Sequence, residues 1–188
     1  MTAPNRIEIS EPGGFWFFGY GSLMWDPPFP AAETQRARIY GYHRSFCINS
    51  ETYRGTPEKP GLSLGLDRGG SCTGIAFRIS KSARAEAIRE IEAREMVDDP
   101  IYICRRVALH LSNGPVSGYA LVVNHADRTF AGRLSFEETA RRIAVSRGDR
   151  GPNIDYLANT VAHLDDMGIP EGHLHALLRR AQTIRRPR

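Results

Sequence analysis

Apolar residues in the first two thirds of the chain form short runs that end at glycines or polar turns, and this pattern predicts β-strands. The clearest run, FWFF at residues 15–18, is followed at once by GYGS at 19–22. Such a pattern is typical of a buried strand that enters a tight loop. Two further strands are predicted at residues 38–42 and 46–49.

Alternation of apolar and small residues predicts two hairpins. Three leucines alternate over residues 62–66, and the turn sequence DRGG separates them from the apolar run at 74–79. These features favour a hairpin. A second hairpin is predicted from residues 106–111 and 116–123, which the sequence Asn113-Gly114 joins.

Helical patterns appear between the two hairpins and again near the C-terminus. Residues 83–96 are rich in Ala, Glu and Arg, which are good helix formers. Ser135 and Glu138 have capping-box spacing before a helix predicted through residue 147. Four apolar residues share one helical face over 154–164, and Gly168 follows. A last helix is predicted after Pro170.

Strands first and helices last favour an α+β fold over alternating βαβ units. The 188 residues are 41% hydrophobic and 24% charged, which suits one domain spanning residues 1–188, with a folded core at about 15–180 and an arginine-rich C-terminal tail. The chain has no apolar run of about 18 residues and its first residues lack the apolar core of a secretory signal. We therefore expect a soluble cytoplasmic protein.

The cysteines and charges narrow the expected partners. Three widely spaced cysteines predict neither a disulfide framework nor a zinc site, which fits a reducing cytosol. The net charge of +4 is mostly due to arginine, and five arginines lie in the tail, at positions 179, 180, 185, 186 and 188. The tail could contact phosphates, but a solvated, frayed end is the commoner case, so no nucleic-acid partner and no membrane partner is expected.

Several common motifs are absent from the sequence. Gly19-Tyr20-Gly21 begins like a dinucleotide-binding fingerprint, but Met24 stands where the third glycine is required. Ser22 is outside a Gly-x-Ser-x-Gly elbow because Tyr20 precedes it by two residues. The close histidine pair, His173 and His175, would point to different faces of a helix. No metal and no cofactor is predicted.

The loop after the aromatic run is the first candidate site. Glycines on both sides of Tyr20 allow the backbone to approach a ligand closely. Consecutive N–H groups could then point at an anion or at a carbonyl oxygen. A plain turn remains the alternative.

Glu95 is the second candidate. At 100° per residue it projects between Ile88 and Ile91, on the opposite side of the predicted helix from Glu86 and Glu90. A carboxylate on an apolar face loses hydration, which raises its pKa and suits a general base. Two alternatives stay open: an ion pair with Arg84 or Arg94, or a helix that ends before Glu95 and exposes it to water.

Four motifs together resemble the ChaC-like γ-glutamylcyclotransferases. They are FGYGSLMW at 18–25, RGTPEKPGL at 54–62, REM at 94–96 and NIDYL at 153–157, and the similarity extends from about Phe15 to Leu178. The resemblance implies a γ-glutamylcyclotransferase-like fold, a small mixed β-barrel with flanking helices. It also implies an enzyme that cleaves glutathione to 5-oxoproline and cysteinylglycine without water or metal.

The same resemblance assigns roles to residues. It places the catalytic general acid and base at Glu95 and the binding of the γ-glutamyl group at Phe17, Phe18, Gly19, Tyr20, Gly21, Ser22 and Leu23. Tyr156 could bond the substrate or Glu95, or only pack at a helix start. Arg54 could clamp the glycyl carboxylate, or only be solvated.

The sequence departs from the commonest family pattern after Met96, where VDDPIY replaces a glycine-containing stretch. Asp98 and Asp99 add negative charge that could raise the pKa of Glu95 or change the accepted leaving group. Other γ-glutamyl peptides or amines therefore remain alternative substrates, and a non-catalytic γ-glutamyl-binding module is a further alternative. The sequence leaves the oligomeric state open.

Overall fold

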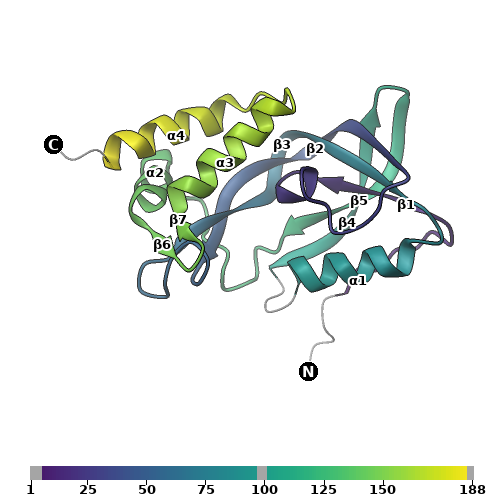
Figure 1. Cartoon of the computed structure of the whole chain (residues 1–188), viewed down its shortest axis with the longest axis horizontal. Helices are drawn as coiled ribbons and strands as arrows, with labels where there is room; N and C mark the ends of the chain where they lie inside the picture. The colour runs from purple at the N-terminus through teal and green to yellow at the C-terminus, as the bar shows by residue number, and fades with distance from the viewer. Residues whose placement is uncertain (1–5, 97–100, 186–188) are drawn as a thin grey trace. The chain divides into compact units, whose positions relative to one another are not determined.

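The computed structural model describes residues 6–96 and 101–185, and within them it shows the predicted α+β fold: a closed β-barrel with helices (Figure 1). The strand order in the barrel is β1-β3-β2-β4-β5. The barrel strands are β1 (Phe15–Gly19), β2 (Glu33–Ser50), β3 (Gly61–Ile79), β4 (Tyr102–Leu111) and β5 (Gly114–Val123). The helices are α1 (Arg84–Glu95), α2 (Phe136–Val145), α3 (Asn153–Asp166) and α4 (Gly172–Arg185), with the 3-10 turn η1 (Ser22–Met24).

The chain divides into two compact units. The first, here called the barrel unit, comprises Met1–Ser45 and Leu66–Asp127, and the second, the helical unit, comprises Phe46–Gly65 and Arg128–Arg188. The single domain over residues 1–188 stays a prediction.

β1 is buried along its whole length, since all five of its residues are buried. It pairs antiparallel with β3, where Phe17 lies opposite Phe77, and parallel with β5, where Phe17 lies opposite Tyr119. The barrel is therefore mixed. A strand with neighbours on both edges and apolar surroundings on both faces needs a continuous apolar run, which explains the sequence FWFF.

α1 packs its apolar face on this core. Ala87 and Ile91 are completely buried there, in one cluster with Phe17 and Phe77. Ile7 and Ile9 belong to the same cluster, although the predicted core began at residue 15. The sequence signal was too short to identify them, because two alternating isoleucines do not define a strand.

Side chains of α1 hold this N-terminal segment in place. The Ile7 N–H donates to Glu92 Oε1 at 2.7 Å, and Arg84 Nη2 donates to the Ile9 carbonyl at 2.7 Å. Arg84 also donates to the carbonyl oxygens of Glu11 and Gly13. Arg84 is thus a structural residue and does not pair with Glu95.

The predicted hairpin over residues 62–79 is wrong, since both halves belong to the one long strand β3. Gly69 and Gly70 have φ values of +99° and +68°, so the residues that suggested a turn adopt their left-handed conformation within the strand. The strands predicted at 38–42 and 46–49 likewise form one strand, β2, with Gly41 at φ +83° inside it. A left-handed glycine inside a strand is typical of a β-bulge, which bends a strand without ending it.

The other predicted elements are present. The hairpin of β4 and β5 is confirmed, with Leu111 opposite Gly114 across a two-residue loop. In the helical unit, the Ser135 hydroxyl accepts the Glu138 N–H at 3.1 Å and caps α2, as predicted. α2 ends at Val145 and not at 147, because Ser146 is extended and leads into the two-residue strands β6 (Arg147–Gly148) and β7 (Gly151–Pro152).

α2, α3 and α4 pack together in the helical unit, beside β6 and β7 (Figure 1). α4 continues to Arg185, so the first part of the expected tail is helical. Arg180 pairs with Glu137 at 2.8 Å and Arg185 with Asp155 at 3.8 Å. Arg186 and Arg188 lie outside the described residues.

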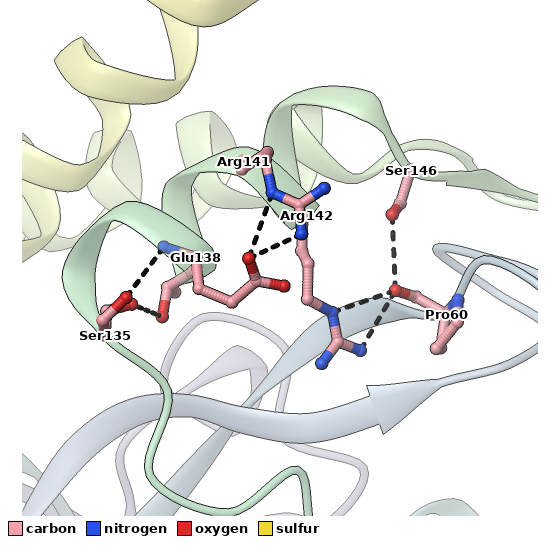
Figure 2. A network of polar contacts seen from close by, with 7 residues as sticks. Pro60, Ser135, Glu138, Arg141, Arg142 and Ser146 are labelled. Carbon is pink, nitrogen blue, oxygen red and sulfur yellow. Dashed lines mark hydrogen bonds and ion pairs between the residues drawn. The ribbon is translucent and has the colours of Figure 1, made fainter.

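Polar contacts from α2 fix the segment between β2 and β3. The Pro60 carbonyl accepts hydrogen bonds from Arg142 Nη2 at 3.1 Å and from the Ser146 hydroxyl at 3.3 Å (Figure 2). From α3, the Asn153 side chain accepts the Leu62 N–H at 2.7 Å and donates to the Leu62 carbonyl at 2.8 Å. The Asn153 side chain is completely buried. The amide therefore replaces the partner that a neighbouring strand would supply to Leu62.

Asn153→Ala is expected to lower the free energy of unfolding by about 2–4 kcal/mol, because the buried N–H and carbonyl of Leu62 both lose their partner. Asn159→Ala is the matched control, since Asn159 lies on the same helix but is exposed. We expect the control to stay within about 0.5 kcal/mol of wild type in urea unfolding. Equal stabilities of the two variants would contradict this role for Asn153.

The three cysteines are free thiols that are fully or partly buried. Cys47 and Cys72 are buried, and Cys104 is partly buried. Burial raises the pKa of the Cys104 thiol to about 12. At neutral pH this thiol is protonated, so it is a poor nucleophile.

No helix among the described residues is long and apolar enough to span a membrane.

Candidate functional site

The glycine loop after β1 has two carbonyl groups held by hydrogen bonds. The carbonyl of Tyr20 accepts from Arg44 Nε at 2.6 Å, and that of Gly21 accepts from the Met24 N–H at 2.9 Å. The C=O and the following N–H of a trans peptide point in opposite directions. The N–H groups of Gly21 and Ser22 therefore point away from these partners, and both residues are half-exposed. This arrangement can donate hydrogen bonds to an oxyanion or a carboxylate.

Where β1 meets the loop, neighbouring atoms lie so close to Gly19 and Gly74 that a side chain has little or no room. A Cβ at Gly19 would lie 3.0 Å from the Phe77 ring, and one at Gly74 would lie 2.2 Å from the Gly19 carbonyl oxygen. The second contact is with backbone and cannot be relieved by rotating a side chain. The absence of a side chain at Gly74 on β3 thus allows β3 to lie this close to Gly19, where the loop begins.

Arg44 supports the loop from within the barrel unit. Its residue surface is only 4% exposed, and its guanidinium donates to the Tyr20 and Thr73 carbonyls, at 2.6 and 2.5 Å. It also contacts the Met24 sulfur at 3.5 Å. A planar group with five donors can hold several acceptors in a fixed arrangement. Arg44 therefore ties β2, β3 and both ends of the loop together.

Glu95 is the last residue of α1, and its side chain is only 20% exposed. Burial raises the pKa of this carboxyl, and the nearby Arg94 lowers it, with burial having the larger effect. Glu95 was predicted either to be a base of raised pKa or to form an ion pair, and the structure shows both features. Its Oε1 lies 3.3 Å from Arg94 Nε, and its pKa is still raised. Such a carboxyl takes up a proton more readily than an ordinary glutamate, which suits a group that acts first as base and then as acid.

Arg94 brings the two candidate features together. One guanidinium lies 3.3 Å from the Glu95 carboxylate and donates to the Ser22 hydroxyl at 3.0 Å. The loop and the carboxylate are far apart in the sequence, but they share this neighbour in the barrel unit. A mostly buried carboxyl of raised pKa and the loop with its free-facing peptide edge are thus linked by one side chain, an arrangement that suits acyl transfer.

The remaining predicted binding residues have different surroundings. Phe17 and Phe18 are completely buried and support the loop as part of the core. Tyr20 and Leu23 are also buried, with 8% and 6% of their surfaces exposed. Among the predicted loop residues, Gly21 and Ser22 are therefore the ones best placed to reach a ligand.

Arg54 and Tyr156 contact one another in the helical unit. The Arg54 guanidinium lies over the Tyr156 ring at 5.1 Å, and Arg54 Nη1 donates to the Arg150 carbonyl at 2.5 Å. Phe46 packs edge-on against the same ring at 5.7 Å. Their possible substrate contacts stay predictions. Asp98 and Asp99 lie outside the described residues.

No group of three or more metal-ligating side chains gathers anywhere in residues 6–96 and 101–185. The histidines considered above have other partners: His173 packs against Phe136 at 5.7 Å, and His175 bonds Asp165 at 3.0 Å. The backbone carbonyl of Glu171 and the Asp165 carboxylate raise the pKa of His175.

Sequence comparison finds known relatives along nearly the whole chain. The family described as ChaC-like protein matches residues 15–184. γ-Glutamylcyclotransferase 2-3 of Arabidopsis thaliana is 32% identical over 90% of this chain and 89% of its own length. The glutathione-specific γ-glutamylcyclotransferase of Escherichia coli is 30% identical over 89% of this chain and 73% of its own.

Structure comparison supports the fold. The crystal structure of a γ-glutamyl cyclotransferase specific to glutathione from yeast superimposes with a TM-score of 0.80 and 24% sequence identity. The match covers 92% of this chain and 97% of the yeast chain. The expected γ-glutamylcyclotransferase-like barrel is confirmed.

Proposed function

Because the chain belongs to the ChaC-like family, we propose that it is a γ-glutamylcyclotransferase that acts on glutathione, with Glu95 as general base and then general acid. The observation that carries this proposal is the mostly buried Glu95 carboxyl, of raised pKa, which Arg94 links to the glycine loop. The substrate is inferred from what the relatives act on.

The reaction needs little from the protein because both reacting groups belong to one molecule. The α-amine of the γ-glutamyl group attacks the γ-carbonyl carbon and forms a five-membered lactam. The amide C–N bond then breaks, which gives 5-oxoproline and cysteinylglycine, and no water is consumed. Holding the two groups in contact supplies much of the rate enhancement.

Proton transfer is the remaining task. The α-ammonium must lose one proton before attack, and the same nitrogen must lose a second once its bond to the γ-carbon has formed. The departing nitrogen gains two protons and leaves as the ammonium group of cysteinylglycine. In our proposal Glu95 accepts each proton in turn and donates it to the leaving nitrogen. A carboxyl whose pKa is raised toward neutrality performs both transfers better than an ordinary one.

The loop has a separate role in this proposal. Negative charge develops on the γ-carbonyl oxygen as the amine attacks. The outward N–H groups of Gly21 and Ser22 donate to this oxygen or to the substrate carboxylate, and their fixed positions stabilise charge without rearrangement. Arg44 and the Met24 N–H bind the carbonyl groups of Tyr20 and Gly21, and these bonds fix the peptide groups that carry the two N–H donors.

Incubation with glutathione is expected to yield 5-oxoproline and cysteinylglycine in equal amounts, which chromatography of the products measures. γ-Glutamyl-alanine is the comparison substrate, and we expect slower turnover of it than of glutathione. Faster turnover of γ-glutamyl-alanine would assign the chain to other γ-glutamyl compounds. Failure to form 5-oxoproline from either would favour a binding module without catalytic activity.

A further inference from the structure

Arg94 contacts three residues with its three guanidinium nitrogens. Nη2 donates to the Ser22 hydroxyl at 3.0 Å, and Nη1 lies 2.5 Å from the Asp26 carbonyl oxygen and 3.1 Å from its carboxylate. Nε lies 3.3 Å from Glu95 Oε1. The side chain is 28% exposed, so these contacts form where water only partly competes. One rigid group thus connects the end of α1 to the loop that follows β1.

The place of Glu95 in its helix makes such a connection necessary. Glu95 is the final residue of α1, and the cap residue Met96 forms the last bond of this helix, from its N–H to the Glu92 carbonyl. Helix ends fray because their final turn has fewer backbone partners. A carboxyl at this position keeps a defined orientation only if a contact from outside the helix holds it.

The contacts also distribute the charge of Arg94. Asp26 and Glu95 lie on different nitrogens of the same guanidinium, so Arg94 is shared between two carboxylates. Arg94 lowers the pKa of Glu95, but the effect of burial is larger and the pKa stays raised. A full, unshared ion pair would make Glu95 a weaker base. The shared pair holds the carboxylate in place and leaves it basic.

We propose that Arg94 is a positioning residue that fixes the Glu95 carboxylate relative to the Ser22 end of the glycine loop. The proposal rests on the function proposed above, since it assigns a task within the same site. Fixed spacing between base and loop keeps the substrate amine near the base while its carbonyl oxygen meets the N–H groups. A lysine could keep the positive charge but could not reach all three residues, because it has a single nitrogen.

Two substitutions separate the charge from the geometry. Arg94→Gln removes both, and we expect kcat to fall by about 10–100-fold, as when reacting groups are misplaced by about 1 Å. The low-pH limb of the kcat/KM profile should move to higher pH, because the charge that lowers the pKa of Glu95 is gone. Arg94→Lys should restore the position of this limb while kcat stays low.

Arg89→Gln is the matched control. Arg89 lies on the same helix, its side chain is 69% exposed, and it pairs with Glu90 at 3.6 Å. We expect wild-type kcat and an unchanged pH profile for this variant. Thermal unfolding of each variant shows whether it is folded under assay conditions.

The outcomes distinguish this inference from the proposed function. If the wild-type protein forms no 5-oxoproline, the proposed function fails whatever Arg94 does. If the wild type is active and Arg94→Gln retains kcat within twofold with an unmoved pH limb, the positioning role is wrong. If Arg94→Gln does not fold, Arg94→Lys decides: a loss of kcat with the pH limb in place supports the role, and wild-type kcat overturns it.

Discussion

Glu95→Gln is expected to abolish 5-oxoproline formation, with a loss of at least about 10²–10⁴-fold in kcat. The amide has nearly the same shape as the carboxyl but cannot accept a proton from the α-ammonium. Product formation from glutathione measures the effect. Glu86→Gln is the matched control, because Glu86 is an exposed glutamate on the same helix. Turnover by Glu95→Gln at the rate of this control would exclude Glu95 as the base.

The same variant is expected to remain folded at neutral pH, and this follows from the sign of the pKa shift. The pKa of Glu95 is raised by burial in the folded protein, so the folded state favours the protonated carboxyl. As the pH rises above the ordinary glutamate pKa, ionisation of Glu95 progressively reduces the stability of the wild type. Gln removes this penalty, so its thermal stability relative to wild type should improve as the pH rises from acidic to neutral.

The pH dependence of the wild type provides a second readout of the same carboxyl. A general base acts only when it is ionised, so kcat/KM should rise with pH through the pKa of free-enzyme Glu95. Because that pKa is raised, the limb should lie above the range of an ordinary glutamate. A limb within the ordinary range would show that Glu95 is not desolvated in solution.

Arg44→Met is expected to lower stability by about 2–4 kcal/mol, because the buried carbonyl oxygens of Tyr20 and Thr73 lose a charged donor. The peptide group between Tyr20 and Gly21 can then rotate, so the Gly21 N–H in the same group loses its orientation. We therefore also expect kcat/KM for glutathione to fall by about 10–100-fold in the fraction that remains folded. Urea unfolding and product formation measure the two effects.

Arg38→Met is the control for Arg44. Arg38 lies on the same strand, but it is exposed and donates to the Ser71 hydroxyl at 2.7 Å. The control should change stability by less than about 0.5 kcal/mol. If Arg44→Met behaves as Arg38→Met does, the buried guanidinium does not support the loop.

The sequence singles out Glu95 and the glycine loop as candidates because both break a local pattern, and the family resemblance then implies a role for each. Glu95 is a carboxylate on the apolar side of a helix, and Gly19 and Gly21 interrupt an apolar run. The helices and the β4–β5 hairpin also follow from local patterns. These signals depend only on neighbouring residues, so no knowledge of the tertiary structure was needed.

Arg44 and the connecting role of Arg94 could not be predicted in the same way. Arg44 follows His43 in β2, and the sequence does not show which of the two turns inward. The contacts of Arg94 depend on where the loop after β1 lies, which is a tertiary feature. The glycines of β3 misled the prediction for a related reason: turn residues and strand bends use the same left-handed conformation, and only the pairing partners distinguish them.

The stretch that matches the family model and the packed part of this chain begin at different residues. The family match starts at Phe15, but Ile7 and Ile9 complete the apolar cluster beneath α1. Arg84 and Glu92 bind the backbone of this segment from the same helix that ends in Glu95. Residues before the family match thus stabilise the element that carries the proposed base. Substitutions in this segment would therefore alter the rigidity of the site while leaving its reacting groups unchanged.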